Sequence, residues 1–205
     1  MAAPVKLLLA SSNPGKLAEF QALASASAAA CQVELALFPG FASLPSFDES
    51  APTFAENAAG KALHYSRLAD NFVLADDSGL VVPALSGAPG VLSARYAGRG
   101  AKDADKIQKL LAEMRGKKGD VRAARFVCVL AVAKQGRALA VVSDFAPGVL
   151  LESPSGTAGF GYDPIFLVPE LNKTFAELSR DEKNRLSHRG KAFRRLIEAF
   201  ASGSA

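Results

Sequence analysis

The first half of the chain alternates between the apolar pattern of strands and that of helices. An unbroken apolar run at 5–10 predicts a short buried strand. The turn after it leads into a helix, because Leu17, Phe20 and Leu23 recur at helical spacing. A second strand is expected at 32–38. This alternation is typical of a sheet covered by helices.

A second helix is expected to begin at Thr53, because Thr53 and Glu56 have the spacing of a capping box. The apolar residues 72–75 then predict a buried strand. That strand is expected to end in a polar bend, Asp76-Asp77-Ser78-Gly79, with the sheet continuing at 80–82.

The second half of the chain contains longer β-rich runs. It predicts, in order, a helix at 101–115, strands at 121–133 and 138–145, a glycine-rich loop at 156–164, a strand at 165–168 and a closing helix at 186–200. The turn Lys134-Gln135-Gly136-Arg137 makes the first two of these strands a hairpin. A hairpin after alternating strands and helices predicts a mixed sheet in an α/β fold, formed by a single domain over residues 1–205.

Composition narrows the class of protein. Hydrophobic residues make up 49% of the chain, enough for a substantial core. No apolar run approaches the roughly 20 residues of a membrane helix, so we expect a soluble, cytoplasmic protein without a membrane partner. The net charge of +4 allows an anionic partner, but basic and acidic residues are mixed rather than segregated.

Few residues could hold a soft metal ion. The chain has two cysteines, Cys31 and Cys128, each in an apolar stretch, and two histidines. Both cysteines are expected to be small buried hydrophobes. A metal here would be a hard cation held by Asp and Glu, such as magnesium.

Two segments that follow predicted strands carry candidate chemistry. Ser11–Lys16 joins a strand to a helix start, which offers backbone N–H groups and a lysine to a phosphate; an ordinary capped helix start is the alternative. Asp76 and Asp77 end a strand, where α/β sheets bind ligands, although an acidic turn would look the same. Adjacent strand residues point to opposite faces, so the two carboxylates are expected to do different jobs.

Two further segments are weaker when taken alone. The glycines of Gly159–Pro164 permit close approach to a flat ligand on which Phe160 could stack, or form only a tight turn. Lys183 could reach a ligand together with His188 and Arg189 if these begin a helix, or all three could be helix surface. Glu49 lies in a polar connector and, considered by itself, is expected to be an acidic residue on the surface.

Taken in order, these segments resemble the inosine triphosphate pyrophosphatase family, also called Ham1-like. The resemblance covers essentially the whole chain. Its most specific motifs are Thr53-Phe54-x-Glu56-Asn57-Ala58 with Lys61, Ala75-Asp76-Asp77-Ser78-Gly79-Leu80, Gly87-Ala88-Pro89-Gly90, Ser93-Ala94-Arg95-Tyr96, Gly159–Pro164, and Lys183 with Ser187-His188-Arg189.

The resemblance implies an Mg²⁺-dependent homodimeric enzyme that hydrolyses ITP, dITP and XTP to the monophosphate and pyrophosphate, removing them before they enter DNA and RNA. It implies an elongated α/β fold, a long mixed sheet flanked by helices, and two lobes with a central nucleotide-binding cleft. Glu49 and Asp77 would bind magnesium, and Asp77 would also be the catalytic base, with Asp76 in support. The substrate-binding residues implied are Ser11, Ser12, Asn13, Pro14, Gly15, Lys16 and Lys61 for the triphosphate, Ser78, and Phe160, Gly161, Tyr162, Asp163, Lys183, His188 and Arg189 for the base and sugar.

Two other interpretations remain open. A Maf-like pyrophosphatase has related chemistry but prefers pyrimidine or modified nucleotides, and the Gly159–Pro164 and Ser187-His188-Arg189 segments count against it. A nucleotide sensor or nucleic-acid-binding protein fits the basic pI of about 9.1. It would predict an unbroken basic stripe, which this sequence lacks, so no nucleic-acid partner is expected.

Overall fold

The computed structural model describes residues 5–26 and 33–201. Within them the strands are β1 (Val5–Leu9), β2 (Val33–Leu37), β3 (Phe72–Val81), β4 (Ala123–Lys134), β5 (Arg137–Leu150), β6 (Phe166–Val168) and β7 (Lys173–Thr174). They form one sheet in the order β2-β1-β3-β4-β5-β6-β7. β1 runs parallel to β2 and β3, whereas β6 is antiparallel to β5 and β7. The predicted mixed sheet is therefore confirmed.

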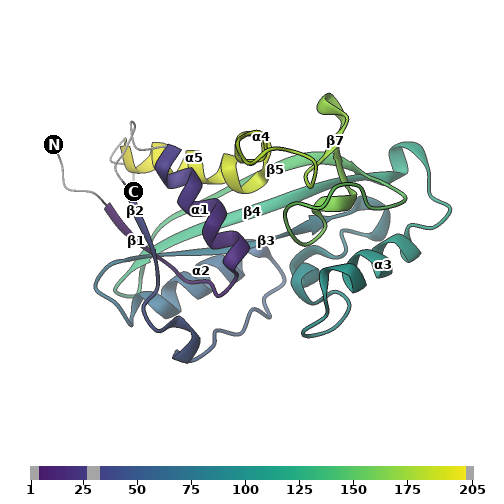
Figure 1. Cartoon of the computed structure of the whole chain (residues 1–205). Coiled ribbons are helices and arrows are strands. Elements are labelled where there is room, and N and C mark those ends of the chain that lie inside the picture. The colour runs from purple at the N-terminus through teal and green to yellow at the C-terminus, as the bar shows by residue number, and fades with distance from the viewer. Residues whose placement is uncertain (1–4, 27–32, 202–205) are drawn as a thin grey trace. The chain divides into compact units, whose positions relative to one another are not determined.

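Helices flank this sheet (Figure 1). The α-helices are α1 (Pro14–Ala26), α2 (Phe54–Ser66), α3 (Asp103–Glu113), α4 (Arg180–Leu186) and α5 (His188–Ala201). Side-chain caps begin two of them: Thr53 accepts the Glu56 N–H, as expected from the sequence, and Ser179 forms a full capping box with Glu182. Glu56 accepts from the Thr53 hydroxyl at 2.7 Å.

The chain divides into two compact units. Unit 1 comprises Met1–Asp77, Cys128–Asp144 and His188–Ala205, and unit 2 comprises Ser78–Val127 and Phe145–Ser187. Three of the four boundaries fall inside β3, β4 and β5, and the fourth falls after Ser187, between α4 and α5.

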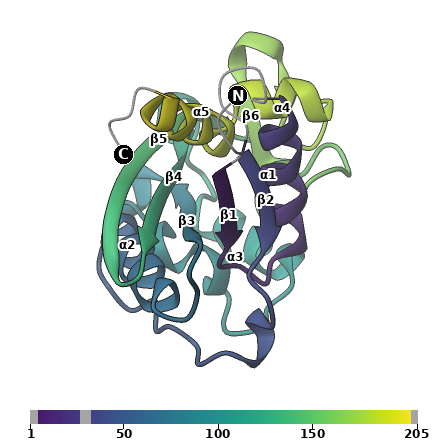
Figure 2. The ribbon, with the colours of Figure 1, turned by 90° about the vertical axis from the view of Figure 1, so that its left-hand side faces the viewer.

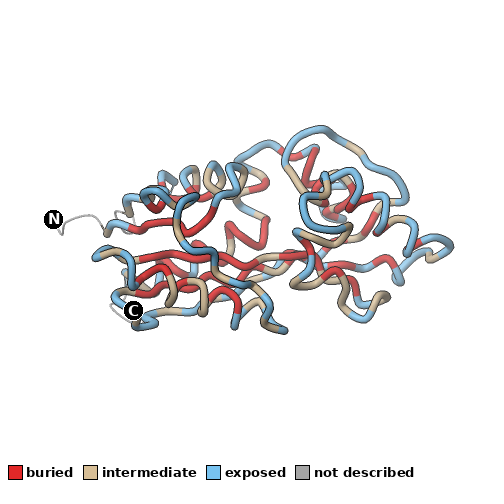
Figure 3. Tube along the Cα trace, turned by 90° about the horizontal axis from the view of Figure 1, so that it is seen from below, coloured by how far each residue is buried: buried red, intermediate tan, exposed pale blue. Residues whose placement is uncertain are grey.

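The core of unit 1 lies between its strands and two helices. Phe20 of α1 and Phe193 of α5 pack with their ring centroids 5.7 Å apart over apolar residues of β1, β3 and β4. In Figures 1 and 2, α1 and α5 lie on one side of these strands and α2 on the other. The buried stretches follow the strands and the inner faces of the helices (Figure 3).

The core of unit 2 is built around three phenylalanines. Phe126 stacks on Phe175 at 5.8 Å, and both contact Phe166. Ile107 and Leu110 bring the inner face of α3 onto this cluster. Because the outer positions of α3 are exposed, the helix is amphipathic, as its sequence predicts.

One element prediction is wrong. Asp76–Gly79 is not a bend at the end of a strand, because β3 continues without interruption from Phe72 to Val81. The closing helix expected at 186–200 is confirmed as α5, and α4 is an additional helix before it, with Ser187 between the two in extended conformation. His188 therefore begins a helix, as its proposed role requires.

Two sequence-based expectations concern the environment of the chain. Cys128 is buried and forms no disulfide, whereas Cys31 lies outside the described residues. None of the helices in the described part of the chain is both long and apolar enough to span a membrane.

Candidate active site

The pleat of β3 sends its two consecutive carboxylates in different directions. The Asp76 side chain is fully buried and forms an ion pair with Lys16 of α1. Its Oδ2 accepts from the Cys128 thiol at 3.2 Å and lies 3.7 Å from Nε of Arg189. Asp76 thus has cationic and hydrogen-bonding partners.

Arg189 extends this buried ionic cluster, which we define as Lys16, Asp76, Arg189 and Glu19. Its guanidinium forms an ion pair with Glu19 of α1, and the residue is 3% exposed. Burial opposes the charge on Arg189, but Glu19 and Asp76 outweigh it and raise its pKa. Two acids and two bases therefore compensate each other where α1, α5 and β3 meet.

Asp77 has the opposite environment. Burial raises its pKa from 3.8 to about 6, and the nearby charges of Glu49 and Asp76 add to the effect. A hydrogen bond from Asn57 and the charge of Lys16 act in the other direction. Among the described residues, nothing forms a hydrogen bond with its buried Oδ2. Asp77 is thus a carboxylate whose charge is poorly compensated.

The connector before α2 places Glu49 next to this carboxylate. Asn57, completely buried on α2, accepts from Ala51 N at 3.0 Å and donates to Ala51 O at 3.2 Å. A Cβ on Gly60 would lie 2.6 Å from the Phe47 ring, so glycine lets the connector cross α2 at close range. The path of the connector is therefore fixed on both sides of Glu49.

Lys61 of α2 forms an ion pair with the carboxylate of Glu49. Its Nζ lies 2.5 Å from Glu49 Oε1, and the side chains are 12% and 30% exposed. A lysine predicted to bind phosphate is thus held by a residue predicted to bind metal. Either ligand would have to compete with this pair.

Glu49 and Asp77 fit a hard cation better than a soft one. The part of the chain that the structure describes holds no group of three or more His, Cys, Asp and Glu side chains suited to a metal. Magnesium commonly takes only one or two protein carboxylates, with waters and substrate phosphates completing its shell. A buried carboxylate with a raised pKa and an unsatisfied oxygen suits that chemistry.

The Ser11–Lys16 segment forms a capped helix start. Asn13 Oδ1 accepts from the backbone N–H groups of Gly15 at 2.9 Å and Lys16 at 3.1 Å. Ser11 Oγ accepts from Asn13 N at 3.2 Å. Three backbone donors of the segment are therefore used within it, and its lysine, Lys16, is paired with Asp76.

In unit 2, Asp163 organises the glycine-rich loop. Its Oδ2 accepts from Phe160 N at 2.9 Å and from Lys183 Nζ at 2.6 Å. Lys183 Nζ also lies 5.0 Å from the centre of the Phe160 ring. A Cβ on Gly159 would approach Asp163 Oδ2 to 2.1 Å, so glycine is required at this position.

Ser93 ties this loop to β3. Its Oγ accepts from Leu80 N at 2.9 Å and donates to Gly90 O at 2.6 Å. Its carbonyl accepts from the Tyr162 hydroxyl at 3.0 Å. Tyr162 is 3% exposed, which makes it an anchor of the loop.

The predicted site residues fall into two groups. Unit 1 holds Ser11, Ser12, Asn13, Pro14, Gly15, Lys16, Glu49, Lys61, Asp77, His188 and Arg189, and unit 2 holds Ser78, Phe160, Gly161, Tyr162, Asp163 and Lys183. Within unit 1, Lys16, Glu49 and Asp77 interact electrostatically. His188 and Arg189 are both buried.

Sequence reasoning gave no role to several residues that hold these groups. Glu19 is a member of the buried ionic cluster, Cys128 contacts it, and Asn57 forms a hydrogen bond with Asp77. Asn57 stands in one of the motifs that carry the resemblance. Glu19 pairs with Arg189, 170 positions later in the chain, so no local spacing indicates its role.

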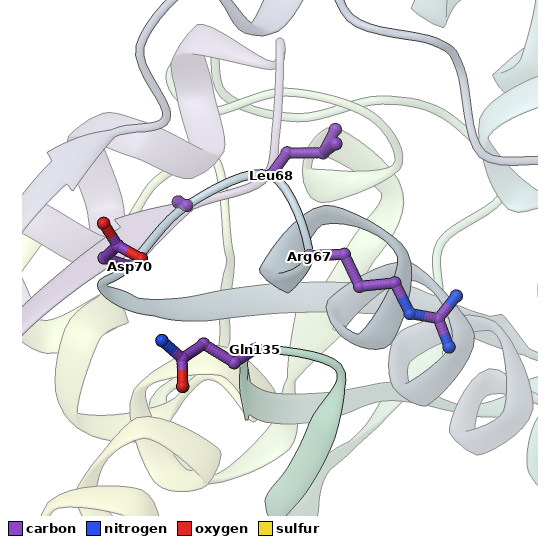
Figure 4. A pocket seen from close by; sticks show the side chains of 5 residues that line it. Arg67, Leu68, Asp70 and Gln135 are labelled. Carbon is purple, nitrogen blue, oxygen red and sulfur yellow. The ribbon is translucent and has the colours of Figure 1, made fainter.

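One pocket of unit 1 lies apart from these residues. It has a volume of about 390 Å³ and is lined by Arg67, Leu68, Ala69, Asp70 and Gln135. In Figure 4 the charged end of Arg67 points away from Asp70 and Gln135. These polar groups do not converge, and none belongs to the predicted site.

Comparisons with known proteins point to one family. The Ham1 family profile matches residues 7–199. A dITP/XTP pyrophosphatase of Geobacillus kaustophilus is 49% identical over 95% of this chain and 94% of its own length. One from Gloeobacter violaceus is 48% identical over 97% and 95%.

Solved structures agree with the sequence comparison. A HAM1 protein from Coxiella burnetii superposes with a TM-score of 0.84 at 40% identity, covering 97% of this chain and 99% of that one. The Staphylococcus aureus Ham1 protein gives a TM-score of 0.82 at 36% identity, covering 98% and 100%. With the match extending over nearly all of its length, the chain belongs to the Ham1 family.

Proposed function

We propose that this protein is a nucleoside-triphosphate pyrophosphatase that hydrolyses dITP, ITP and XTP to the monophosphate and pyrophosphate. The nearly full-length similarity to relatives named dITP/XTP pyrophosphatase supports this reaction and this substrate class. Its role would be to remove these purine nucleotides before polymerases use them.

The observation that carries the proposal is the environment of Asp77. A general base works best when its pKa lies near the working pH, and burial and neighbouring carboxylates raise the pKa of Asp77 to about 6. Asp76, one residue earlier, is neutralised by Lys16 and Arg189. The base is therefore Asp77, and Asp76 supports it by holding Lys16.

Glu49 and Asp77 would hold Mg²⁺. Bound there, the ion would neutralise phosphate charge and stabilise the departing pyrophosphate. In its absence the two carboxylates repel each other, and this repulsion contributes to the raised pKa of Asp77. Lys61 neutralises Glu49 at 2.5 Å and would be released to a phosphate when Glu49 changes partner.

The reaction consumes one water. Its oxygen forms a bond to the α-phosphorus as Asp77 takes a proton, and the bond from that phosphorus to the oxygen bridging to the β-phosphate breaks. Pyrophosphate leaves with the electron pair of that bond. Lys16 and Lys61 would stabilise the charge that builds on the phosphates, with Ser11, Ser12 and Asn13 as further polar contacts.

The loop Gly159–Pro164 would contact the nucleobase. Phe160 supplies a ring for stacking, and Lys183 supplies a donor for an oxo group. Such a donor favours the 6-oxo group of hypoxanthine and xanthine over the 6-amino group of adenine. Buried hydrogen bonds of this kind can discriminate by about 10⁴–10⁵, because a mismatched partner leaves them unpaired. His188 and Arg189 retain their proposed base-side role, although Arg189 pairs here with Glu19.

Pyrophosphate release tests the proposal. We would measure it with ITP, XTP, dITP, ATP, GTP and dUTP, each with Mg²⁺ and with EDTA. Magnesium-dependent release from ITP, dITP and XTP, with little from ATP and GTP, is the expected result. A preference for dUTP would favour the pyrimidine-directed alternative, and no release from any nucleotide would refute the enzyme activity.

Two further proposals rest on the family resemblance. The protein would form a homodimer and act in the cytoplasm. Light scattering on the purified chain measures the first, and a mass of about 21 kDa rather than twice that value would contradict it.

A further inference from the structure

The loop Gly159–Pro164, which we propose contacts the nucleobase, is held by a carboxylate from outside the loop as well as by its own Asp163. Asp103, the first residue of α3, lies 58 positions before Gly161 and accepts its N–H at 2.6 Å through Oδ2. The preceding N–H, that of Phe160, is taken by Asp163 at 2.9 Å. Two carboxylates of different origin therefore bind the amides on both sides of Phe160.

Asp103 is itself held in place. Its Oδ1 lies 2.6 Å from Nζ of Lys106, one helical turn later, whose side chain is 11% exposed. Burial raises the pKa of Asp103, but the hydrogen bonds from Lys106 and Gly161 outweigh it and leave the pKa below its ordinary value. The carboxylate is charged at neutral pH, and both of its oxygens have partners.

Gly161 cannot supply this restraint on its own. Its φ of +64° lies in the left-handed region, and no heavy atom lies within 4 Å of where its Cβ would be. Side-chain packing therefore does not hold this position, and the contact to Asp103 does. Since Phe160 lies between the two bound amides, the same contact restricts how its ring is presented.

We propose that Asp103 is a positioning residue for nucleobase binding: it fixes Gly161, and through it Phe160, in the orientation that receives the base. The inference rests on the proposed base-side role of this loop. The partners of Asp103 are Gly161 and Lys106, neither of which has a role in the proposed chemical step, so we expect it to act on substrate affinity rather than on kcat.

The test compares Asp103→Ala with Asp105→Ala. Asp105 lies in the same helical turn and caps Lys102 N at 3.0 Å, and no hydrogen bond of the structure joins it to the described loop residues. Asp103 has a side chain that is 46% exposed, so its removal should leave the fold intact. The first measurement is the hydrogen-exchange rate of the Gly161 amide without nucleotide, and the second is steady-state hydrolysis of ITP.

We expect Asp103→Ala to speed Gly161 exchange about 10-fold and to raise KM for ITP about 10-fold, with kcat within about twofold, since a charge-assisted hydrogen bond is lost. Asp105→Ala should change neither value, and Asp103→Asn, which keeps an acceptor, should restore part of both. Lys106→Met should give an intermediate effect.

Two results would overturn the proposal. Unchanged Gly161 exchange in Asp103→Ala would mean that the contact does not restrain the loop. Faster exchange with unchanged KM would mean that loop order does not govern base binding. Both results are distinguishable from failure of the proposed function, which would appear in the unmodified protein as absent pyrophosphate release.

Discussion

At the scale of residues, Asp76 and Asp77 show how neighbours in a strand acquire opposite properties. They are chemically identical and both buried, yet Asp76 pairs with Lys16 and lies near Arg189, whereas Asp77 faces Glu49. The folded state therefore stabilises the charge of Asp76 and opposes that of Asp77. Substitution by asparagine should therefore change the free energy of unfolding in opposite directions at the two positions.

Asp77→Asn should stabilise the metal-free protein at alkaline pH. The folded pKa of about 6 exceeds the ordinary value of 3.8, so ionisation costs folding free energy as pH rises between these values. At pH 8 the full cost, at most about 3 kcal/mol, is removed in the variant; below pH 4 the two proteins should be alike. Thermal unfolding in EDTA at both pH values measures this, and Asp48→Asn, an exposed carboxylate, is the control.

The same variant should lose activity. A general base contributes about 10²–10⁴-fold to rate, so pyrophosphate release should fall by at least about 100-fold. Nucleotide binding, measured by calorimetry, should largely persist. Near-normal turnover would exclude Asp77 from the base role.

Asp76→Asn should have the opposite effect on stability. The substitution leaves the buried charges of Lys16 and Arg189 without their shared carboxylate, which costs about 3 kcal/mol or more. Asp144→Asn is the matched control, because its partner Arg195 is 62% exposed and such a pair contributes about 1 kcal/mol or less. Urea unfolding of both variants decides the point, and equal stabilities would contradict the ionic cluster.

At the scale of elements, the sequence identified most helices and strands but misplaced the acidic motif. Asp76–Gly79 contains the polar residues and glycine of a turn, yet β3 runs through it, because the partners of its buried polar groups come from other elements. The local composition around Asp76 does not indicate that Lys16 and Cys128 are its partners, because both are distant in the chain. The helix α4 has no counterpart among the expected elements, because its seven residues are mostly charged and polar and carry no apolar pattern.

The connector before α2 is a second case in which one element controls another. Asn57→Ala removes the two hydrogen bonds to Ala51 and the one to Asp77, so Glu49 loses its fixed position. We expect the magnesium concentration for half-maximal activity to rise about 10-fold, as is usual when residues that orient metal ligands are removed.

Thr53→Ala is the control for Asn57→Ala. It removes the cap of the same helix, at a cost of about 1 kcal/mol, without touching the connector. If Thr53→Ala raised the magnesium concentration for half-maximal activity as much as Asn57→Ala does, the effect of Asn57→Ala would be general destabilisation of α2.

At the scale of the whole molecule, the order of motifs along the chain was enough to indicate the family, because several unrelated segments had to occur in one sequence. The division into units was beyond such reasoning. Three of its boundaries, after Asp77, Val127 and Asp144, fall within continuous strands, and the fourth falls after Ser187, between α4 and α5. Contacts, rather than breaks in the chain, define the units.

These boundaries predict that the two units unfold together. Because β3, β4 and β5 each belong to both units, unfolding either one disrupts strands that the other needs. Phe193→Ala removes a fully buried ring from the core of unit 1 and should cost about 3–5 kcal/mol. We would measure hydrogen exchange in mild denaturant. The opening free energy of the amides of β6 in unit 2 should then fall by the same amount as that of the amides of β1 in unit 1. Phe200→Ala is the control, because Phe200 is only partly buried at the margin of that core. It should lower the opening free energy by a smaller amount, equal in both strands. Unchanged protection of β6 in Phe193→Ala would mean that the units unfold separately although three strands pass from one into the other.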